Sequence, residues 1–232
     1  MFSLSLQDAY QQPLEMQEYY CAQLPNKDQI CKIARLYANA FAGFPWHEYK
    51  VCENGHYHGA QIHELECCTN CGQPLKLVHP EEETCAYIMK EVVKPQGTLI
   101  TFEDKSGEVF AAGWGYACLV EELLDKYSSL EMQAKVQNTL ENVAHKVKTV
   151  FYLSEIMVDE SVQKKGITTK ITKALVEKAR SLDLIFLMRT HCDSPMVRIA
   201  NKFQMSQVIR LEEDLDYPKR VLYIKYQNFD PV

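Results

Sequence analysis

Several common signatures are absent from this chain of 232 residues. Its first residues, MFSLSLQDAYQQPLEMQ, have neither a basic start nor a long apolar run, so we expect no secretory signal. No stretch reaches the length of a membrane span, and no internal repeat or low-complexity tract occurs. The chain contains neither a G-x-G-x-x-G turn nor a G-x-x-x-x-G-K-[S/T] loop. These absences argue against secreted, membrane-spanning, Rossmann-type dinucleotide-binding and P-loop classes.

An excess of positive charge is also absent. Lysine and arginine number 25 against 31 acidic residues, which gives a net charge of −6 and a pI near 5.7. This balance argues against broad nucleic-acid binding and is compatible with a cationic amine as substrate. The 47% hydrophobic and 24% charged content is that of a soluble globular protein. The length predicts one domain over residues 1–232, with room for a small appendage.

Nine cysteines without an expected signal peptide indicate a reducing compartment. Cysteines in such a compartment serve as metal ligands or as plain buried thiols. We therefore expect a cytoplasmic protein in which some cysteines hold a metal.

Periodicity and turn residues predict an α/β order of elements. The order is β-α, a cysteine-rich segment, α-β-β, a polar helical stretch, β-α-β-α, and one or two closing strands. The expected elements are strands at 18–24, 97–103, 108–118, 150–158, 184–188 and 220–226, helices at 28–42, 81–93, 167–182 and 195–203, and the helical stretch at 119–148.

The segment Glu155 to Lys170, EIMVDESVQKKGITTK, joins the apolar strand at 150–158 to an amphipathic helix through a short polar turn. The first N–H groups of a helix have no partner inside the helix and lie at the positive end of its dipole, so they hold a pyrophosphate well. Gly166 lets the backbone approach such a ligand, and Lys164 and Lys165 add positive charge. The segment therefore predicts a phosphate-binding loop.

This segment resembles the acetyl-CoA signature Q/R-x-x-G-x-G/A of the GNAT acetyltransferases, which lies on the turn after their fourth strand. Gln163 takes the first position and Gly166 the first glycine. Thr168 stands where the family usually has Gly or Ala, which is a departure. The stretch from Arg189 to Met196, RTHCDSPM, also resembles the family's crossing from strand to helix.

The resemblance extends to the order of elements over almost the whole chain. It implies a GNAT acyl-CoA-binding fold, an α/β architecture with a mixed, mostly antiparallel sheet that splays at the fourth strand and is flanked by helices. Two departures are the 119–148 connection, expected to be a helical insertion, and the cysteine-rich segment at 50–76.

The resemblance also implies site residues for acetyl-CoA. A backbone N–H of Val158, or of Met157 beside it, meets the thioester oxygen. Ser194, expected as N-cap of the helix that Pro195 opens, is a further candidate contact. The residues matching the pyrophosphate loop are Gln163, Lys164, Lys165, Gly166, Ile167 and Thr168.

Glu155 is the candidate general base, because a carboxylate within an apolar strand is costly to bury unless it faces a cleft or a partner. The alternative is a structural glutamate bonded to a neighbouring strand or a water. The general acid is not evident, since the family's tyrosine position falls on Ala200. Three alternatives remain: another group such as Cys192 or Ser194 protonates the CoA thiolate, solvent protonates it, or the activity is lost. His191 is at most a substrate contact.

The cysteine-rich segment contains Cys68-Thr69-Asn70-Cys71-Gly72, a knuckle that aims two thiolates at one tetrahedral zinc. Cys52 and His56 upstream complete a closed Cys3His site, with His58, His63 and Cys67 as competitors for the fourth position. Some GNAT proteins carry a small zinc-ribbon-like insert at this place. Four protein ligands leave no open position, so we expect a structural zinc that fixes a loop or presents a surface. The remaining cysteines, Cys21, Cys31, Cys85 and Cys118 among them, are expected to be free thiols.

Together these features predict an acetyl-CoA-dependent N-acetyltransferase that transfers the acetyl group to a primary amine by direct attack in a ternary complex. The acceptor is a small molecule or a protein amine, and Trp46 either lines its pocket or lies buried beneath the zinc segment. The alternatives are a catalytically impaired acetyl-CoA sensor and an interaction module that uses the zinc insert. No nucleic acid or membrane is expected as partner, and a homodimer is compatible with the sequence.

Overall fold

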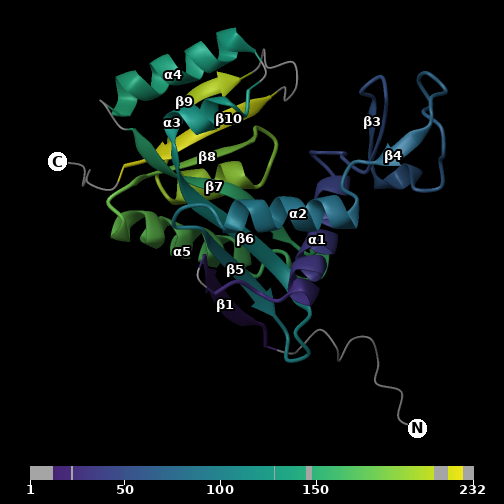
Figure 1. Cartoon of the computed structure of the whole chain (residues 1–232), viewed down its shortest axis with the longest axis horizontal. Coiled ribbons are helices and arrows are strands. Elements are labelled where there is room, and N and C mark those ends of the chain that lie inside the picture. The colour runs from purple at the N-terminus through teal and green to yellow at the C-terminus, as the bar shows by residue number, and fades with distance from the viewer. Residues whose placement is uncertain (1–12, 22, 128, 145–147, 212–218, 227–232) are drawn as a thin grey trace.

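The computed structural model describes residues 13–21, 23–127, 129–144, 148–211 and 219–226. The expectation of no signal segment concerns residues 1–12, which lie outside the described residues, as do four positions of the 119–148 stretch. The described chain forms a seven-stranded sheet with helices on both faces (Figure 1). A separate three-stranded sheet lies to one side of the main sheet, beyond two of the helices (Figure 1).

The seven strands follow the order β1-β5-β6-β7-β8-β10-β9, and every neighbouring pair is antiparallel except β7 and β8. This arrangement confirms the predicted mixed, mostly antiparallel sheet. The strands are β1 Glu15–Tyr20, β5 Thr98–Glu103, β6 Val109–Leu119, β7 Thr149–Val158, β8 Ile185–His191, β9 Ser206–Leu211 and β10 Arg220–Lys225.

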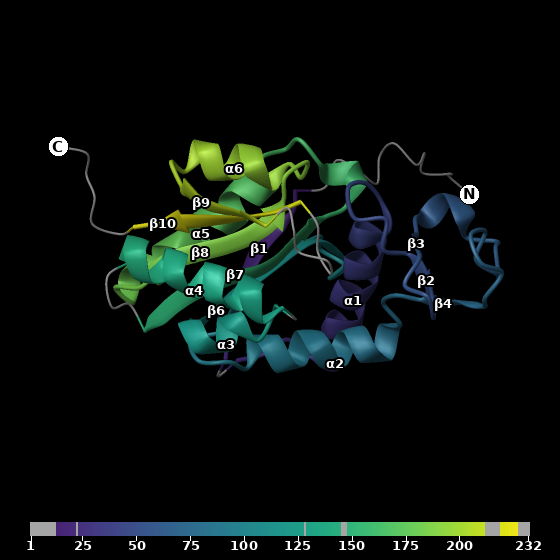
Figure 2. The same cartoon turned by 90° about the horizontal axis from the view of Figure 1, so that it is seen from above.

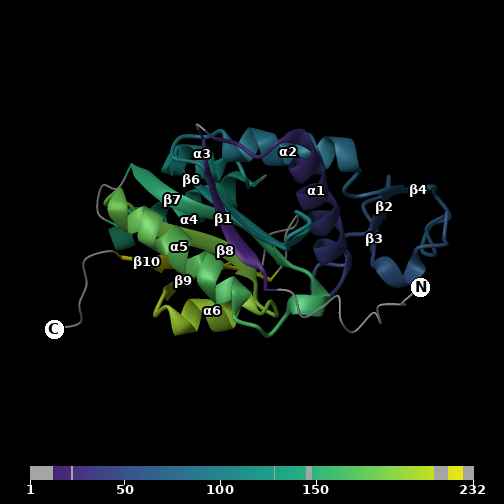
Figure 3. The same ribbon diagram turned by 90° about the horizontal axis from the view of Figure 1, so that it is seen from below.

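Helices cover both faces of the sheet (Figures 2 and 3). The first face carries α1 Lys27–Ala42, α2 Glu81–Val92, α3 Val120–Leu124 and α4 Leu130–Ala144. The second carries α5 Ile167–Ser181 and α6 Met196–Lys202. Within the described residues, no helix is both long and apolar enough to cross a membrane.

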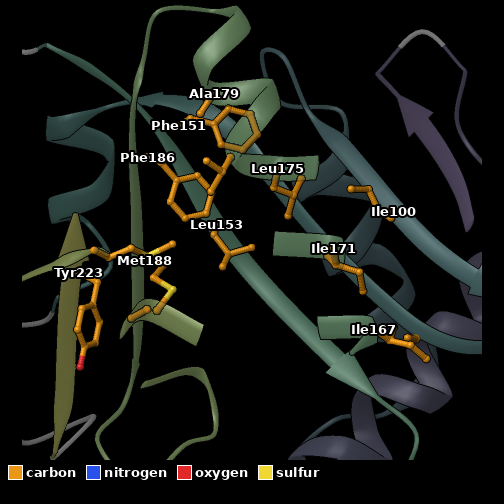
Figure 4. Packing of buried hydrophobic residues seen from close by; sticks show 14 of the residues in the cluster. Ile100, Phe151, Leu153, Ile167, Ile171, Leu175, Ala179, Phe186, Met188 and Tyr223 are labelled. Carbon is orange, nitrogen blue, oxygen red and sulfur yellow. The ribbon is translucent and has the colours of Figure 1, made fainter. Parts of the chain in front are cut away.

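The core beneath α5 shows why this helix docks where it does. Ile171, Leu175 and Ala179 recur at helical spacing and are fully buried against the sheet (Figure 4). They pack on Phe151 of β7 and Phe186 of β8, whose rings stack with centroids 6.2 Å apart. The start of α5, and with it the turn before the helix, is therefore fixed at the end of β7.

The pairing between β7 and β8 ends early. Val150 to Leu153 pair with Ile185 to Met188, and no pairing is recorded beyond Leu153, although both strands continue. This divergence confirms the predicted splay at the strand that precedes the signature loop. At the same place β7 carries a bulge, because Glu155 pairs with Trp114 while Leu153 pairs with the next residue of β6. Ser154 is therefore an extra residue on β7, opposite no partner of its own.

The cysteine-rich segment forms the small sheet, with strand order β3-β2-β4 and antiparallel pairing throughout. It lies in sequence between α1 and α2 and projects beyond them (Figures 1 and 2). Its strands are β2 Lys50–Cys52, β3 Tyr57–His58 and β4 Leu75–Leu77. Two short 3-10 turns, Ala60–Ile62 in this segment and Glu160–Val162 after β7, are the remaining elements of the described residues.

One strand prediction differs from the structure. The first strand was expected at 18–24 and is found at 15–20, where it pairs with β5 from Glu15 opposite Glu103 to Tyr20 opposite Thr98. It is an edge strand with mostly exposed side chains, so no apolar alternation marks where it begins. The strand at 206–211 was covered only by the expectation of one or two closing strands, and it pairs with β10.

Candidate functional site

A cavity of about 590 Å³ opens at the splay between β7 and β8. Helices α1 and α2, the turn after α3, the first residues of α6 and β10, and the two linkers that lead into and out of the small sheet form the rest of its wall. Its lining residues include Tyr37, Phe41, Trp46, Glu48, His79, Glu83, Tyr87, Asp125, Lys126, Tyr152, Leu153, Ser154, Glu155, Ile156, Met188, Arg189, Thr190, Met196 and Arg220. A concave site of this size accommodates a small molecule.

Glu155 lies in this cavity, half-buried, on the part of β7 that is no longer paired with β8. Its Oε1 accepts a hydrogen bond of 3.2 Å from the Tyr87 hydroxyl on α2. Burial away from water raises the pKa of Glu155 to about 7, although the Lys126 charge and the Tyr87 hydrogen bond oppose the shift. Such a carboxyl is half ionised near neutral pH, which suits a group that accepts a proton.

The bulge residue beside Glu155 is held by a buried network. The Ser154 hydroxyl donates to Glu91 Oε2 of α2 at 2.5 Å, and Glu91 also accepts from the Tyr116 hydroxyl at 3.1 Å. Burial opposes ionisation of Glu91, but Lys126 and the Lys94 ammonium at 2.5 Å hold its pKa below the usual range. Because Ser154 and Glu155 both bond to α2, the bulge turns two consecutive side chains toward the same helix.

The opposite wall of the cavity is cationic. Arg189 on β8 and Arg220 at the start of β10 both line the cavity and are at least half-buried. The Arg220 guanidinium lies 4.1 Å from the centroid of the Trp46 ring and 3.8 Å from Glu48 Oε1. Trp46 therefore lines the pocket, which was one of its two predicted placements.

The signature loop has the backbone that the sequence indicated. Gly166 is the N-cap of α5 with φ of 77°, and Lys164 has φ of 63°, so two of its residues are left-handed. Nothing lies within 4 Å of a Cβ built on Gly166, which leaves open space in front of the helix start. Gln163, Lys164 and Lys165 are exposed, whereas Ile167 is buried and Thr168 half-buried. The free N–H groups of this turn can hold an anion such as a pyrophosphate.

Strand alternation separates the two candidates for the thioester contact. The Asp159 N–H donates to the Phe110 carbonyl on β6, and Met157 pairs with Ala112 two positions along the same ladder. In an antiparallel pair successive residues direct their N–H groups to opposite sides, so the Met157 N–H faces β6. The Val158 N–H faces the splay, and so does that of Ile156.

The residues near the start of α6 do not supply a clear proton donor. The Ser194 hydroxyl accepts from the Met196 N–H at 3.2 Å, but the N-cap of α6 is Pro195, one residue after the predicted Ser194. Ala200, at the family's tyrosine position, is fully buried in the core. On the cavity wall, the Thr190 hydroxyl is buried and has no hydrogen-bond partner among the described residues.

A metal-ligand cluster lies in the small sheet. The ligand atoms of Cys52, His56, Cys68 and Cys71 all lie within 4.8 Å of one another. The Sγ atoms of Cys52 and Cys71 are 3.7 Å apart, and His56 Nδ1 is 3.5 Å from both Cys52 Sγ and Cys68 Sγ. Tetrahedral zinc with Zn–S near 2.3 Å and Zn–N near 2.0 Å sets these separations at about 3.8 and about 3.5 Å. The four residues therefore fit a closed zinc site.

The three residues that competed for the fourth ligand position lie outside the four-residue cluster. His58 Nε2 is 3.3 Å from Cys68 Sγ alone, a position suited to a hydrogen bond to a ligating thiolate. His63 and Cys67 are exposed and do not join the cluster. The Asn70 N–H also points to Cys68 Sγ at 3.4 Å, as expected of a knuckle.

The small sheet connects directly to the cavity wall. The Tyr49 N–H donates to the His58 carbonyl, and the Val78 N–H donates to the Tyr49 carbonyl, both at 3.0 Å. Their neighbours Glu48 and His79 face the cavity and bond to each other at 3.2 Å. The small sheet therefore holds the two linkers that carry one wall.

Sequence reasoning did not single out the groups that surround Glu155. Tyr87 and Glu91 lie on the predicted helix at 81–93, where they read as ordinary helix residues. Arg189 and Arg220 carried a usable signal, since each is a charged residue at the end of an apolar strand. Their convergence on one cavity depends on the order of strands in the sheet, which cannot be read from the sequence.

No family model and no curated protein matches this chain. Solved structures do match it over nearly its whole length. NAA60 of Arabidopsis thaliana, in complex with a bisubstrate analogue, is 10% identical with a TM-score of 0.55 and covers 92% of this chain and 99% of its own. Drosophila melanogaster polyamine N-acetyltransferase is 10% identical with a TM-score of 0.55, covering 91% and 100%.

A third structure carries the family name. A GNAT superfamily phosphinothricin acetyltransferase from Sinorhizobium meliloti, in complex with acetyl-CoA, is 10% identical with a TM-score of 0.52, covering 95% and 94%. At these identities the likeness establishes the fold, and this chain has the GNAT fold.

Proposed function

We propose that this protein is an acetyl-CoA-dependent N-acetyltransferase that transfers the acetyl group directly to an amine. The observation that carries the proposal is the cavity at the splay, where Glu155 lies on the same strand that leads into the left-handed Gly166 turn. A proton acceptor and an anion-binding helix start are thereby held at the two ends of one short segment. The acetyltransferase activities of structures with this fold support the proposal.

In this proposal the loop from Gln163 to Thr168 binds the pyrophosphate through the N–H groups at the start of α5. The pantetheine arm follows the unpaired edge of β7, and the Val158 N–H, which points into the splay, donates to the thioester oxygen. The acyl carbon is thereby placed next to the cavity that contains Glu155.

The chemical step moves one acetyl group and one proton. Glu155 takes a proton from the acceptor ammonium, directly or through water, and the free amine attacks the thioester carbonyl. The new C–N bond forms as the C–S bond breaks, and CoA leaves as a thiolate that is protonated by solvent or by a cavity group. No tyrosine takes this role from α6, because Ala200 occupies the position.

We also propose that residues 50–76 form a zinc-bound insert within a single GNAT-like domain, and that the protein works in the cytoplasm. The ligand separations in the Cys52, His56, Cys68 and Cys71 cluster support the metal. The zinc supplies no chemistry to the acetyl transfer, since four protein ligands close its coordination shell. Its role is to hold the linkers at Glu48 and His79 against the cavity.

The experiment that tests the function measures release of free CoA thiol from acetyl-CoA with a panel of primary amines. We expect amine-dependent turnover in the wild type, with the acetylated amine identified by mass spectrometry. Release of CoA that does not depend on any amine, from a protein that binds acetyl-CoA, would favour the alternative of a sensor without turnover. Absence of acetyl-CoA binding by the zinc-loaded protein would refute the proposal.

A further inference from the structure

Two cysteines meet where α1 packs against α2. Cys31 lies in the first half of α1 and Cys85 in the first half of α2, 54 residues apart in sequence. Their sulfur atoms are 3.5 Å apart, and the Cys85 thiol donates to the Cys31 sulfur. Both are free thiols in the structure, and the proposed acetyl transfer uses neither of them.

A second contact joins the same faces of the two helices. Arg35, one turn after Cys31 on α1, lies 3.2 Å from Glu81, which is one turn before Cys85 on α2. Side chains four residues apart share a helix face. The thiols therefore meet because the two helices pack on these faces, and an ion pair beside them holds the same contact.

Other residues of α1 and α2 line the cavity. Tyr37 of α1 and Tyr87 of α2 have ring centroids 6.0 Å apart, and both belong to the cavity wall. Tyr87 also donates its hydroxyl to Glu155. The relative position of the two helices is therefore part of the geometry around Glu155. A covalent bond between the thiols would act on this wall from outside the cavity, since neither cysteine is among its lining residues.

The environment of the two thiols gives them different roles. Both are half-buried, whereas Cys118 is buried in the core. Burial raises the pKa of Cys85 to about 11, and the neighbouring Cys31 raises it further, so Cys85 keeps its proton. A donor beside a sulfur favours the charged form of that sulfur, and the thiolate is the form that reacts. Cys31 is therefore the thiol that reacts first, and Cys85 is the one that completes a bond.

We propose that Cys31 and Cys85 are a site of reversible oxidation, where a peroxide or a small disulfide forms a bond that ties α1 to α2. With hydrogen peroxide, the Cys31 sulfur attacks one oxygen and becomes a sulfenic acid as water leaves. The Cys85 sulfur then displaces the second oxygen as water, so that the thiols lose two hydrogens and the peroxide becomes two waters. With oxidised glutathione, one disulfide replaces another and two molecules of glutathione leave. A reducing thiol reverses the bond.

The bond requires little movement and closes a long loop. A disulfide is about 2.05 Å long, so the sulfurs approach by roughly 1.5 Å, a distance that side-chain rotation can cover. The closed loop contains the whole small sheet with its metal-ligand cluster, which lies between α1 and α2 in sequence. Closing a loop of this length reduces the entropy of the unfolded chain, so the oxidised protein is expected to be more stable than the reduced one.

The test treats the zinc-loaded protein with oxidised glutathione, blocks the remaining thiols with iodoacetamide and maps disulfides by mass spectrometry without reduction. We expect one pair of peptides joined through Cys31 and Cys85, which dithiothreitol separates. The zinc content should not change, because the metal-site thiols have not reacted. Cys21→Ser removes an exposed cysteine outside both helices and is the matched control, which should form the same bond.

Thermal unfolding measures the same event independently. Oxidation should raise the Tm of the wild type and of Cys21→Ser by roughly 5–15 °C, as expected for a loop of this length in a chain of this size. Cys31→Ser and Cys85→Ser should show no rise. Without oxidant, each serine variant should melt within a few degrees of the wild type, which verifies that it is folded. Cys31→Ala should behave like Cys31→Ser, because the effect comes from the loss of sulfur.

Three results would overturn the inference. The first is a wild type in which no bond between Cys31 and Cys85 forms, or in which glutathione stays attached to a single cysteine as the stable product. The second is a bond that joins either thiol to a metal-site cysteine with loss of zinc. The third is a rise in Tm that persists in both serine variants. None of these measurements needs turnover, so they can fail or succeed independently of the proposed acetyl transfer.

Discussion

Replacing Glu155 by Gln should slow acetyl transfer and yet stabilise the protein at neutral pH. The substitution keeps the size of the side chain and an oxygen that can accept from the Tyr87 hydroxyl, so the 3.2 Å contact can persist. It removes the only feature under test, the ability of the group to ionise. Activity and stability are therefore expected to move in opposite directions.

The stability effect follows from proton linkage. Burial raises the pKa of Glu155 from 4.5 to about 7, so the folded state holds a proton that the unfolded state has lost between these pH values. The contribution of this group to stability is therefore complete below pH 4.5 and is lost as the pH rises to about 7. A shift from 4.5 to about 7 corresponds to at most about 3 kcal/mol.

Urea unfolding at pH 5, 6, 7 and 8 measures this. The free energy of unfolding of Glu155→Gln should exceed that of the wild type by an amount that grows between pH 5 and pH 7 and is constant above it. Glu131→Gln, at an exposed position on α4, is the control and should show no such trend. A difference that is equal at pH 5 and pH 8 would show that Glu155 ionises normally in the folded protein.

The kinetic effect is measured on the same variants. Loss of a general base costs typically about 10²- to 10⁴-fold in rate, and we expect kcat/KM of Glu155→Gln to fall within this range. Wild-type kcat/KM should rise with pH and bend near pH 7, and the bend should vanish in the variant while the slope from the acceptor's own ionisation remains. Full activity with an unchanged pH profile would assign Glu155 a structural role instead.

Three further predictions concern the loop, the metal and the sheet. Gly166 has a φ of 77° and faces open space, and Gly166→Trp should weaken acetyl-CoA binding at least about 100-fold by calorimetry. The reason is the loss of several charge-assisted hydrogen bonds of about 1.5–3 kcal/mol each. Gly166→Asn, whose side chain tolerates this backbone conformation, should retain most of the affinity for acetyl-CoA. Elemental analysis should find one zinc per chain, which Cys68→Ser loses and His58→Ala keeps. Removal of the zinc should raise the KM for the acceptor more than it weakens acetyl-CoA binding. Loss of zinc from the His58 variant alone would reassign the ligand. Gly115→Ala should lower the free energy of unfolding by about 1–3 kcal/mol, since its Cβ would meet Phe151 at 2.7 Å and the Tyr152 carbonyl at 2.8 Å; an unchanged urea midpoint would show that β6 and β7 relax apart.

The features that the sequence predicted are local in the chain. The turn at Gly166 needs a strand, a left-handed residue and a helix start within a few positions, and all three leave marks in the residue pattern. The cysteine knuckle is equally local, since Cys68 and Cys71 flank their own turn. The predicted ends of the helices were close to the observed ones for the same reason: α1 spans residues 27–42, and the prediction was 28–42.

The features that the sequence did not predict come from distant segments. The bulge at Ser154 exists only relative to β6, so one strand read alone gives no sign of it. The approach of Arg189 to Arg220 requires β10 to enter the sheet beside β8, thirty residues away in sequence. The pKa of Glu155 depends on α2, which supplies Tyr87 from 68 residues earlier. Chemistry at this site is thus determined by topology more than by any motif.

The small sheet begins and ends at neighbouring residues, since Tyr49 and Val78 are joined by a backbone hydrogen bond. A segment whose ends meet in this way can be lengthened, shortened or exchanged for another without altering the order of strands in the rest of the protein. Selection can therefore act on the wall that carries Glu48 and His79 independently of the turn that precedes α5. The strand that carries Glu155 belongs to the main sheet, whereas Glu48 and His79 lie on the linkers of a segment that can be exchanged.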